Sequence, residues 1–584
     1  MSGVFNRKNL IPACLLLAGF AAFIWKMRIA GPIEYVGHAD ASGYAEMADS
    51  ILKGRGLEVD YISWYFRKYE NIERPEDHWP PFYSFLILPF FLFMGKTAIA
   101  AKLPSILISC FAFPLTVYAL TLRLARSRAA AFAAGMTILF YTPMFGWSMR
   151  CLSDVTFGWL VAAAVLAFLK GEEEPRWHWA AGALLAGAYY AKGSTIVLLP
   201  AFALYYLLWR VLRKPERKWI RHDRDVAIGL AVFLALLSPW AVRNMVHFGQ
   251  PLYSTQNHAA GYIGWKAWED GTYDLYWGEK EPPSVADKFK QPEQLVEKSV
   301  EFYKSHFWWV FMNIHRKWGD FKTDDLSTYA VGFPALFGML FWVLSASLAA
   351  ARRLRRGTGK GAALDGMAAW TKPFRPLPFV LFFLVSMAHL SFLSICWQPI
   401  NRLITPVIAL VAAFGYAFLF HVVERAAAEL RHRRRIAAGA ALALLTLWGA
   451  HEARDLTHAR EKAGYPWRES SQGWMEVGRW IRENAPGSIA MTRNPWELHF
   501  YSEEKAVQIP LAPLDRIIEV GKYYGATHLI PEKRRPTLEP WLSGEIPGLT
   551  KMTEAHGVEL YEIDYGALPE TLPGAAASSS IDAP

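Results

Sequence analysis

The sequence has few cysteines and lacks the common motifs of nucleotide-binding proteins and metalloproteases. Its four cysteines, at positions 14, 110, 151 and 396, form no CxxC pair, which argues against a structural zinc site or a disulfide framework. No GxxxxGK[ST] loop, no GxGxxG on a strand–helix turn and no HExxH occurs. Nucleotide and zinc-protease chemistry therefore lack their usual residues.

The chain also has little of the polar surface that a soluble protein of 584 residues needs. Hydrophobic residues make up 53% of it and include 25 Trp, 25 Tyr and 36 Phe. They form long blocks with the charges between them, and the mean hydropathy is positive. This pattern is typical of a polytopic membrane protein.

Blocks of about 20 apolar residues predict about eleven membrane-spanning helices. They cover residues 10–30, 98–121, 129–147, 155–170, 178–191, 195–212, 225–242, 329–350, 376–396, 403–422 and 436–450. Clusters of basic residues follow the second, sixth, eighth and tenth blocks. All four clusters fall on one side, which the positive-inside rule assigns to the cytoplasm. Topology therefore explains the net charge of +10 better than a nucleic-acid ligand does.

This topology places the N-terminus in the cytoplasm and three large segments outside, at residues 31–97, 243–328 and after about 450. The apolar stretch at 78–95 is short and begins with prolines, which favours a juxtamembrane or re-entrant helix. After residue 450 the sequence predicts an amphipathic helix (473–486), short strands and a second helix (514–525). The fold class is thus mainly α, with a membrane domain (1–450), a small extracytoplasmic α/β domain (451–566) and a disordered tail (567–584).

Ionisable residues collect where the predicted spans meet the outer surface, and polar groups at that depth usually line a cavity or pathway. They are His38, Asp40, Asp77, His78, Arg150, Asp154, Lys192, Arg243 and Arg402. The cations suit a phosphate group. Asp40 suits a general base that takes the proton of an incoming hydroxyl. This combination predicts transfer of a group from a phosphate-bearing lipid.

Seven segments in order resemble the GT-C membrane glycosyltransferases, over about residues 10–425. They are DASGYAEMADSILKGRG (40–56), HWPPFY (78–83), IAAKLPSILIS (99–109), LSDVTF (152–157), GAYYAKGSTIVLLP (187–200), PWAVRNMVHFGQPL (239–252) and PINRLITPVIAL (399–410). The bacterial branch that adds aminoarabinose or galacturonic acid to lipid A and core oligosaccharide is the most similar, and protein O-mannosyltransferases are more distant. Two departures concern the substrate: Ala41, Ser42 and Gly43 stand where that branch has a glutamate and an arginine, and His78 and Trp79 replace Glu and Lys.

The resemblance implies a polyprenyl-phosphate sugar donor and an inverting transfer to a lipid, glycan or protein hydroxyl in the bacterial inner membrane. The resemblance implies Asp40 and Asp154 for catalysis, Lys192 and Arg243 for the donor phosphate, and Tyr44 for the substrate. Their place at the outer surface adds Arg402 and Arg150 as candidates for the phosphate, and the candidates for the substrate also include His78 and Tyr83. A monophosphate leaving group can be served by Arg and Lys, so no metal and no other cofactor is expected.

Simpler interpretations of the same residues remain open. Asp40 and Asp154 are also suited to helix N-termini, and Arg243 and Arg402 to the headgroup layer. Two other classes of protein share these features: a transporter or flippase of a phosphate-bearing lipid, and a non-catalytic assembly protein that recruits an enzyme through its outer domain.

Overall fold

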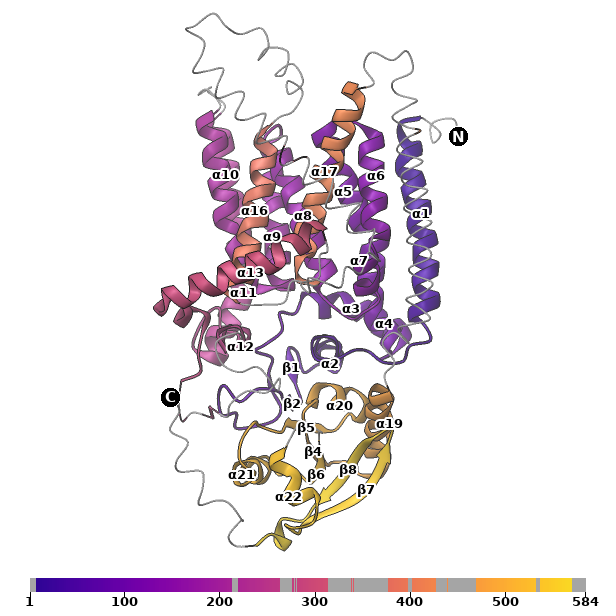
Figure 1. The fold of residues 1–584 in the computed structure, drawn as a ribbon, viewed down its shortest axis with the longest axis vertical. Helices are drawn as coiled ribbons and strands as arrows, with labels where there is room; N and C mark the ends of the chain where they lie inside the picture. The colour runs from indigo at the N-terminus through magenta and orange to yellow at the C-terminus, as the bar shows by residue number, and fades with distance from the viewer. Residues whose placement is uncertain are drawn as a thin grey trace, which may run out of the picture. The chain divides into compact units, whose positions relative to one another are not determined.

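Long apolar helices dominate the computed structural model, which describes residues 7–212, 219–262, 276, 277, 279, 281–312, 338, 340, 376–396, 402–426, 439, 469–531 and 536–569. Among these residues, seven helices are long and apolar enough to cross a membrane (Figure 1). They span Leu10–Ala30, Ala98–Ala125, Asp154–Gly171, Gly193–Leu212, Arg221–Phe248, Leu377–Ile395 and Arg402–Glu424. Each coincides with a predicted span, so the protein is a multi-pass membrane protein.

Four predicted spans are not among these seven. The span predicted at 129–147 is divided into α6 (Arg128–Phe140) and α7 (Thr142–Ser148), because Tyr141 between them has a non-helical backbone. The span predicted at 178–191 is α9 (Trp177–Ala191), whose 15 residues rise only about 22 Å. The spans predicted at 329–350 and 436–450 lie almost entirely outside the described residues. The number eleven therefore stays a prediction.

The apolar stretch at 78–95 forms the short helix α3 (Phe82–Met94). Pro81 precedes it, and Gly95 ends it with a φ of 71° that favours glycine. Its 13 residues rise about 20 Å, which is shorter than the roughly 30 Å of a bilayer core. The structure agrees with the prediction of a helix too short to span.

Contacts divide the chain into two compact units, each made of three segments. The membrane unit comprises residues 1–31, 104–243 and 292–461, and the sheet unit comprises residues 32–103, 244–291 and 462–584. Among the helices they contain or share are α1 (Arg7–Ala30), α4 (Ala98–Leu107), α5 (Phe113–Ala125), α8 (Asp154–Gly171), α10 (Leu199–Leu212), α11 (Trp219–Phe248), α12 (Thr255–Tyr262), α13 (Pro292–Met312), α16 (Pro376–Ile395) and α17 (Thr405–Ala426).

Helix α17 lies at the centre of the membrane unit, where it packs against α5, α6, α8 and α16 (Figure 1). Glycines permit close approach in this unit, as is usual between membrane helices. A Cβ atom on Gly182 of α9 would lie 1.9 Å from the carbonyl oxygen of Gly229 of α11, so these two backbones are in direct contact. The tight packing fixes the ends of the helices relative to one another within the unit.

A six-stranded sheet organises the sheet unit, in the order β2-β5-β4-β6-β8-β7. Its strands are β2 (Tyr61–Ile62), β4 (Ile489–Thr492), β5 (Lys505–Gln508), β6 (His528–Ile530), β7 (Leu549–Ala555) and β8 (Val558–Ile563). The first four in the order are parallel, and β8 and β7 close the sheet as an antiparallel pair. A separate two-residue pair joins β1 (Glu58–Val59) to β3 (Arg74–Pro75).

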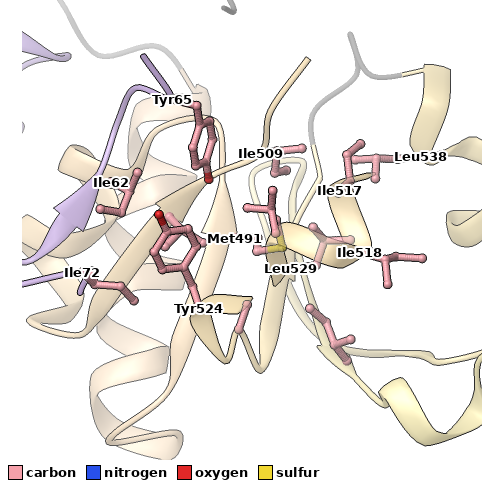
Figure 2. Close-up of a cluster of buried hydrophobic side chains, with 14 of the residues drawn as sticks. Ile62, Tyr65, Ile72, Met491, Ile509, Ile517, Ile518, Tyr524, Leu529 and Leu538 are labelled. Carbon is pink, nitrogen blue, oxygen red and sulfur yellow. The ribbon is translucent and has the colours of Figure 1, made fainter. Parts of the chain in front are cut away.

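Alternate residues of each strand point to opposite faces of this sheet, and different helices cover the two faces. Met491, Val507 and Leu529 face α21 (Leu514–Tyr524) and α22 (Glu539–Leu542), as Figure 2 shows in part. Their chain neighbours Ala490, Ala506 and Ile530 face α19 (Glu469–Asn484) and α20 (Pro495–Ser502). Burial on both faces explains why consecutive residues of these strands, such as Ala490 and Met491 or Ala506 and Val507, are apolar.

The helices and strands predicted after residue 450 correspond to α19, β4, β5, α21, β6 and β8, while β7, α20 and α22 were not predicted. The structure also differs from the sequence-based domain limits. Strand β2 comes from the first predicted loop and pairs with β5, so residues 32–103 and 462–584 share one core. An edge strand of two residues has too weak a pattern to be recognised in a sequence.

Candidate functional site

A buried carboxylate with two cations forms the main ionic cluster of the membrane unit. The Asp154 side chain is 1% exposed, and its oxygens lie 3.1 Å from Lys192 Nζ and 3.4 Å from an Arg402 guanidinium nitrogen. Lys192 and Arg402 are themselves partly exposed, at 18% and 27% of their side chains. Three residues predicted from separate turns are thus brought together, with the carboxylate inside and the cations accessible.

Local breaks in the helices place these three side chains. Asp154 is the first residue of α8. Lys192 is extended between α9 and the 3₁₀ turn Gly193–Leu198, and Arg402 begins the 3₁₀ turn that leads into α17. Gly158, one turn after Asp154, lets α8 approach α17, because a Cβ there would lie 2.5 Å from Thr405 Cγ2. Asp154 and Arg402 therefore meet where α8 and α17 begin.

His389 of α16 supports the cluster and was not predicted. Its imidazole is buried, and Nε2–H donates to the carbonyl oxygen of Leu403 at 2.7 Å, next to Arg402. An ionisable residue inside the apolar run PLPFVLFFLVSMAHLSFLSI is the signal that would have identified it.

The other two predicted phosphate-binding residues are Arg150 and Arg243. Arg150 lies in the turn before α8, within electrostatic range of Arg402 and Asp154; burial and then the positive charge of Arg402 lower its pKa. Arg243 lies on α11, with its guanidinium 4.8 Å from the ring centre of Trp240 one turn earlier. The structure thus adds Arg150 to the Asp154 cluster, and it places Arg243 against its own helix.

Asp40 lies in the sheet unit as the first residue of α2 (Asp40–Leu52). The preceding residue, Ala39, holds the position of the helix cap with φ 46° and ψ −98°, a backbone conformation that non-glycine residues rarely adopt. Asp40 therefore occupies the first helical turn, where the helix dipole favours a negative charge. The helix predicted after Asp40 is confirmed.

The three predicted substrate residues are buried in packing contacts of the sheet unit. The Tyr44 ring lies 5.4 Å from that of Tyr83, whose hydroxyl donates to the carbonyl oxygen of Ala101. His78 stacks on Trp64 with ring centres 4.9 Å apart, and its Nδ1 lies 2.9 Å from Thr255 Oγ1. These contacts join α2 to α3, and the segment before α3 to α12, which gives the three side chains a structural role.

A second buried ionic cluster, centred on Glu46 of α2, was also not predicted. The Glu46 carboxylate lies 3.0 Å from Lys96 Nζ and 2.9 Å from His499 Nε2 of α20. His499 Nδ1–H also donates to the carbonyl oxygen of Glu504 at 2.8 Å. Because both ring nitrogens of His499 face acceptors, the imidazole is doubly protonated.

Burial alone would raise the pKa of Glu46, but the charges of Lys96 and His499 and their hydrogen bonds lower it to about 2. Burial likewise opposes the charge on His499, yet Glu46 raises its pKa above the ordinary value of 6.5. The cluster is therefore a fully ionised tie between α2 and α20.

Among the residues that the structure describes, no three His, Cys, Asp or Glu side chains are grouped so as to hold a metal ion. Among the described residues, the membrane unit thus holds a cationic cluster around Asp154. The sheet unit, described by itself, holds Asp40 at the start of α2.

Residues 78–242 match the family described as dolichyl-phosphate-mannose-protein mannosyltransferase. No curated protein matches the chain. Among solved structures, ArnT from Cupriavidus metallidurans bound to undecaprenyl phosphate is similar at 13% identity and a TM-score of 0.51, over 96% of this chain and 99% of that one. The Archaeoglobus fulgidus oligosaccharyltransferase tethered with an acceptor peptide containing the NVT sequon gives 14% identity and a TM-score of 0.56, over 98% and 76%.

At these identities the structural likeness shows the fold, which is the predicted GT-C fold. The mannosyltransferase match covers α8, α9 and the positions of Asp154 and Lys192. Together these findings indicate a membrane glycosyltransferase.

Proposed function

We propose that the protein transfers a sugar from a polyprenyl-phosphate donor to a hydroxyl group of a lipid, glycan or protein acceptor. The observation that carries this proposal is the Asp154 cluster, in which a buried carboxylate holds Lys192 and Arg402. The undecaprenyl phosphate named with the similar ArnT structure supports a lipid-phosphate ligand. The site would face the outer side of the bacterial inner membrane, as the basic clusters of the sequence imply.

The charge of the cluster suits this reaction. Lys192, Arg402 and Arg150 against one Asp154 carboxylate leave a charge of +2. A sugar-linked lipid phosphate is a diester with one negative charge, and the departing lipid phosphate gains a second. Cations placed before the reaction stabilise this growing charge more in the transition state than in the bound donor.

Asp154 itself is assigned a positioning role here. Its two oxygens lie 3.1 Å from Lys192 Nζ and 3.4 Å from an Arg402 guanidinium nitrogen, so both sides of the carboxylate are engaged by cations. It therefore holds Lys192 and Arg402 in place rather than moving a proton.

Asp40 is assigned as the general base. The acceptor oxygen attacks the anomeric carbon while its proton passes to the Asp40 carboxylate, and the bond from that carbon to the phosphate oxygen breaks. A direct displacement of this kind inverts the anomeric centre. A monophosphate leaving group is served by the cations alone, so the proposed reaction uses no metal.

The test compares wild-type protein with Asp40→Asn, following sugar release from a panel of polyprenyl-phosphate sugars. Asp515→Asn is the matched control, because Asp515 is an acid in the first turn of α21 in the same unit. The proposal expects Asp40→Asn to lose at least about a hundredfold in kcat, the usual contribution of a general base, and Asp515→Asn to lose nothing. Equal turnover by Asp40→Asn and wild type would contradict the base. No turnover by wild type with any donor would favour a transporter or an assembly protein.

A further inference from the structure

Glu497 of α20 contacts the chain immediately before Asp40. Its carboxylate is 2% exposed and accepts hydrogen bonds from the Tyr35 hydroxyl and from His38 Nδ1, the latter at 2.8 Å. The His38 side chain is 61% exposed, and its ring lies edge-on to Trp496. One buried carboxylate from residue 497 thus holds two side chains of the segment that enters α2.

The segment held in this way has a strained backbone. Gly37 has φ 127° and Ala39 has φ 46°, on either side of His38. A side chain at Gly37 would place its Cβ 2.6 Å from that of Ala41. Ser42 Oγ–H closes the turn by donating to the carbonyl oxygen of Gly37 at 2.7 Å. Such a conformation persists only where surrounding contacts enforce it, and strained segments of this kind gather at functional sites.

We propose that α20 is a positioning element for Asp40: Glu497 fixes His38, and His38 holds the strained turn before Asp40 and places its charge near the Asp40 carboxylate. This inference rests on the proposed role of Asp40 as general base. It gives a part of the sequence after residue 450 a direct function in the reaction.

The charges around His38 agree with this role. Desolvation opposes a charged ring, but the charge and hydrogen bond of Glu497, followed by the charge of Asp40, raise the pKa of His38, while Arg493 acts in the opposite direction. The attraction between His38 and Asp40 is mutual, so a protonated His38 favours the ionised form of Asp40. Among the described residues that face His38, the tyrosine hydroxyl of Tyr35 is a further titratable group, and it donates to Glu497.

A second contact makes α20 suited to hold the helix. His499, two residues after Glu497, pairs with Glu46 further along α2. The two pairs bind the turn before α2 and the middle of α2 to the same short helix. These contacts prevent α2 from sliding along its axis and from rotating about it, so they fix the position of Asp40.

The first experiment measures position without requiring turnover. Full-length wild type, Glu497→Ala and Glu476→Ala are compared in detergent by amide hydrogen exchange over residues 35–48. Glu476→Ala is the matched control, because Glu476 forms an exposed pair with His556 at 3.2 Å in the same unit. Glu497→Ala is expected to raise exchange in the first turns of α2 at least about tenfold, as expected for loss of a hydrogen bond to a charged group, and Glu476→Ala to leave it unchanged. Equal exchange in the two variants would overturn the anchoring role.

The second experiment measures the charge effect on Asp40. His38→Gln retains a donor for Glu497 but removes the positive charge, whereas His38→Arg retains the charge. The acid limb of kcat/KM is expected to move to higher pH by up to about one unit in His38→Gln and to stay near its wild-type position in His38→Arg. An acid limb that does not move in His38→Gln, with stability matched by thermal unfolding, would overturn the charge role.

The donor KM should stay unchanged in Glu497→Ala while kcat falls, because the anchor acts on the base and not on the donor phosphate. A rise in donor KM with unchanged kcat would contradict the inference. Full activity of Asp40→Asn would instead contradict the proposed base. Hydrogen exchange distinguishes the two failures, since it reads the anchoring of α2 independently of any reaction.

Discussion

Asp154 shows how one buried acid can organise a cationic site. The carboxylate is almost fully buried at the start of α8, where its contacts with Lys192 and Arg402 compensate the cost of burial. The cations remain partly exposed, which is the arrangement that an anionic ligand requires. Removing one cation therefore tests ligand binding more directly than removing Asp154, which both cations need.

Lys192→Met is expected to lower kcat/KM for the lipid-phosphate donor by about ten- to a hundredfold, the cost of one hydrogen bond to a charged group. The measurement is steady-state kinetics at several donor concentrations. Lys170→Met is the control, because Lys170 lies at the opposite end of α8 and contacts the ring of Trp177. A loss in Lys170→Met as large as that in Lys192→Met would argue against a specific phosphate contact.

The Glu46–His499 pair predicts how stability depends on pH. The pKa of Glu46 is lowered from 4.5 to about 2, so its contribution is complete above pH 4.5 and is lost as the pH falls toward 2. The pKa of His499 is raised above 6.5, so its contribution is complete below pH 6.5 and is lost as the pH rises through the raised value. The pair therefore stabilises the sheet unit most between pH 4.5 and 6.5.

Thermal unfolding across pH 5 to 9 checks this expectation. Wild type should lose stability above pH 6.5. His499→Gln should be less stable than wild type at pH 6 by about 1–3 kcal/mol and should lose less stability than wild type as the pH rises further. His556→Gln, which changes an exposed histidine, should follow the wild-type curve. An alkaline loss in His499→Gln as large as that of the wild type would assign the effect to another group.

At this scale the sequence was informative about residues and less so about their partners. Asp154, Lys192 and Arg402 were predicted to lie together because each is a charge next to an apolar block, and the structure brings them together. Glu46 and His499 were missed because they are 453 positions apart and neither stands in an apolar run. Pairing across such a distance depends on tertiary packing.

At the scale of elements, helix packing controls the geometry of the cationic cluster. Gly158 of α8 faces Thr405, the first residue of α17, and Arg402 lies in the turn that leads into that helix. Any side chain at position 158 must push α8 and α17 apart, which would increase the separation of Asp154 and Arg402.

Gly158→Ala is therefore expected to destabilise the protein by about 1–3 kcal/mol and to raise the donor KM. Thermal unfolding and donor kinetics measure the two effects. Gly146→Ala is the matched control, because a Cβ at Gly146 of α7 would meet no atom within 4 Å. Since alanine favours helices, Gly146→Ala should be neutral or slightly stabilising. If Gly158→Ala keeps the stability and the donor KM of the wild type, the close approach of α8 to α17 does not position Arg402.

Helices were more predictable than their division into spans. Long apolar blocks gave seven helices at the predicted places, because hydropathy depends on local composition. The break at Tyr141, which divides α6 from α7, lies within an apolar stretch and leaves no mark in hydropathy. The helix α20 was missed because PWELHFYS is short and almost entirely buried, so it lacks an amphipathic pattern.

At the scale of the whole molecule, the sheet unit is a composite of three chain segments. Strand β2 from the first predicted loop pairs with β5 and forms the edge of the sheet, and Tyr61 and Ile62 enter the cores on its two faces. The residues after 461 therefore complete a core that begins at residue 32. Sequence alone suggested a separable domain, since composition changes near residue 450 and strand pairing between residues 445 positions apart has no local signal.

This composite core predicts the effect of truncation. A chain ending at residue 461 lacks His499, the partner of the buried Glu46, and Glu497, the partner of Tyr35 and His38. It also lacks β5, with which β2 pairs. Such a chain is expected to lose turnover completely and to show rapid hydrogen exchange over α2, measured on protein purified in detergent. A chain ending at residue 569, which retains β7, β8 and all of α20, is the control and should keep wild-type activity.

An outer domain that only recruits another enzyme would instead leave the chain ending at residue 461 active, because the residues assigned to catalysis and phosphate binding all precede residue 461. Activity of that chain would therefore separate an accessory domain from the composite unit described by the structure.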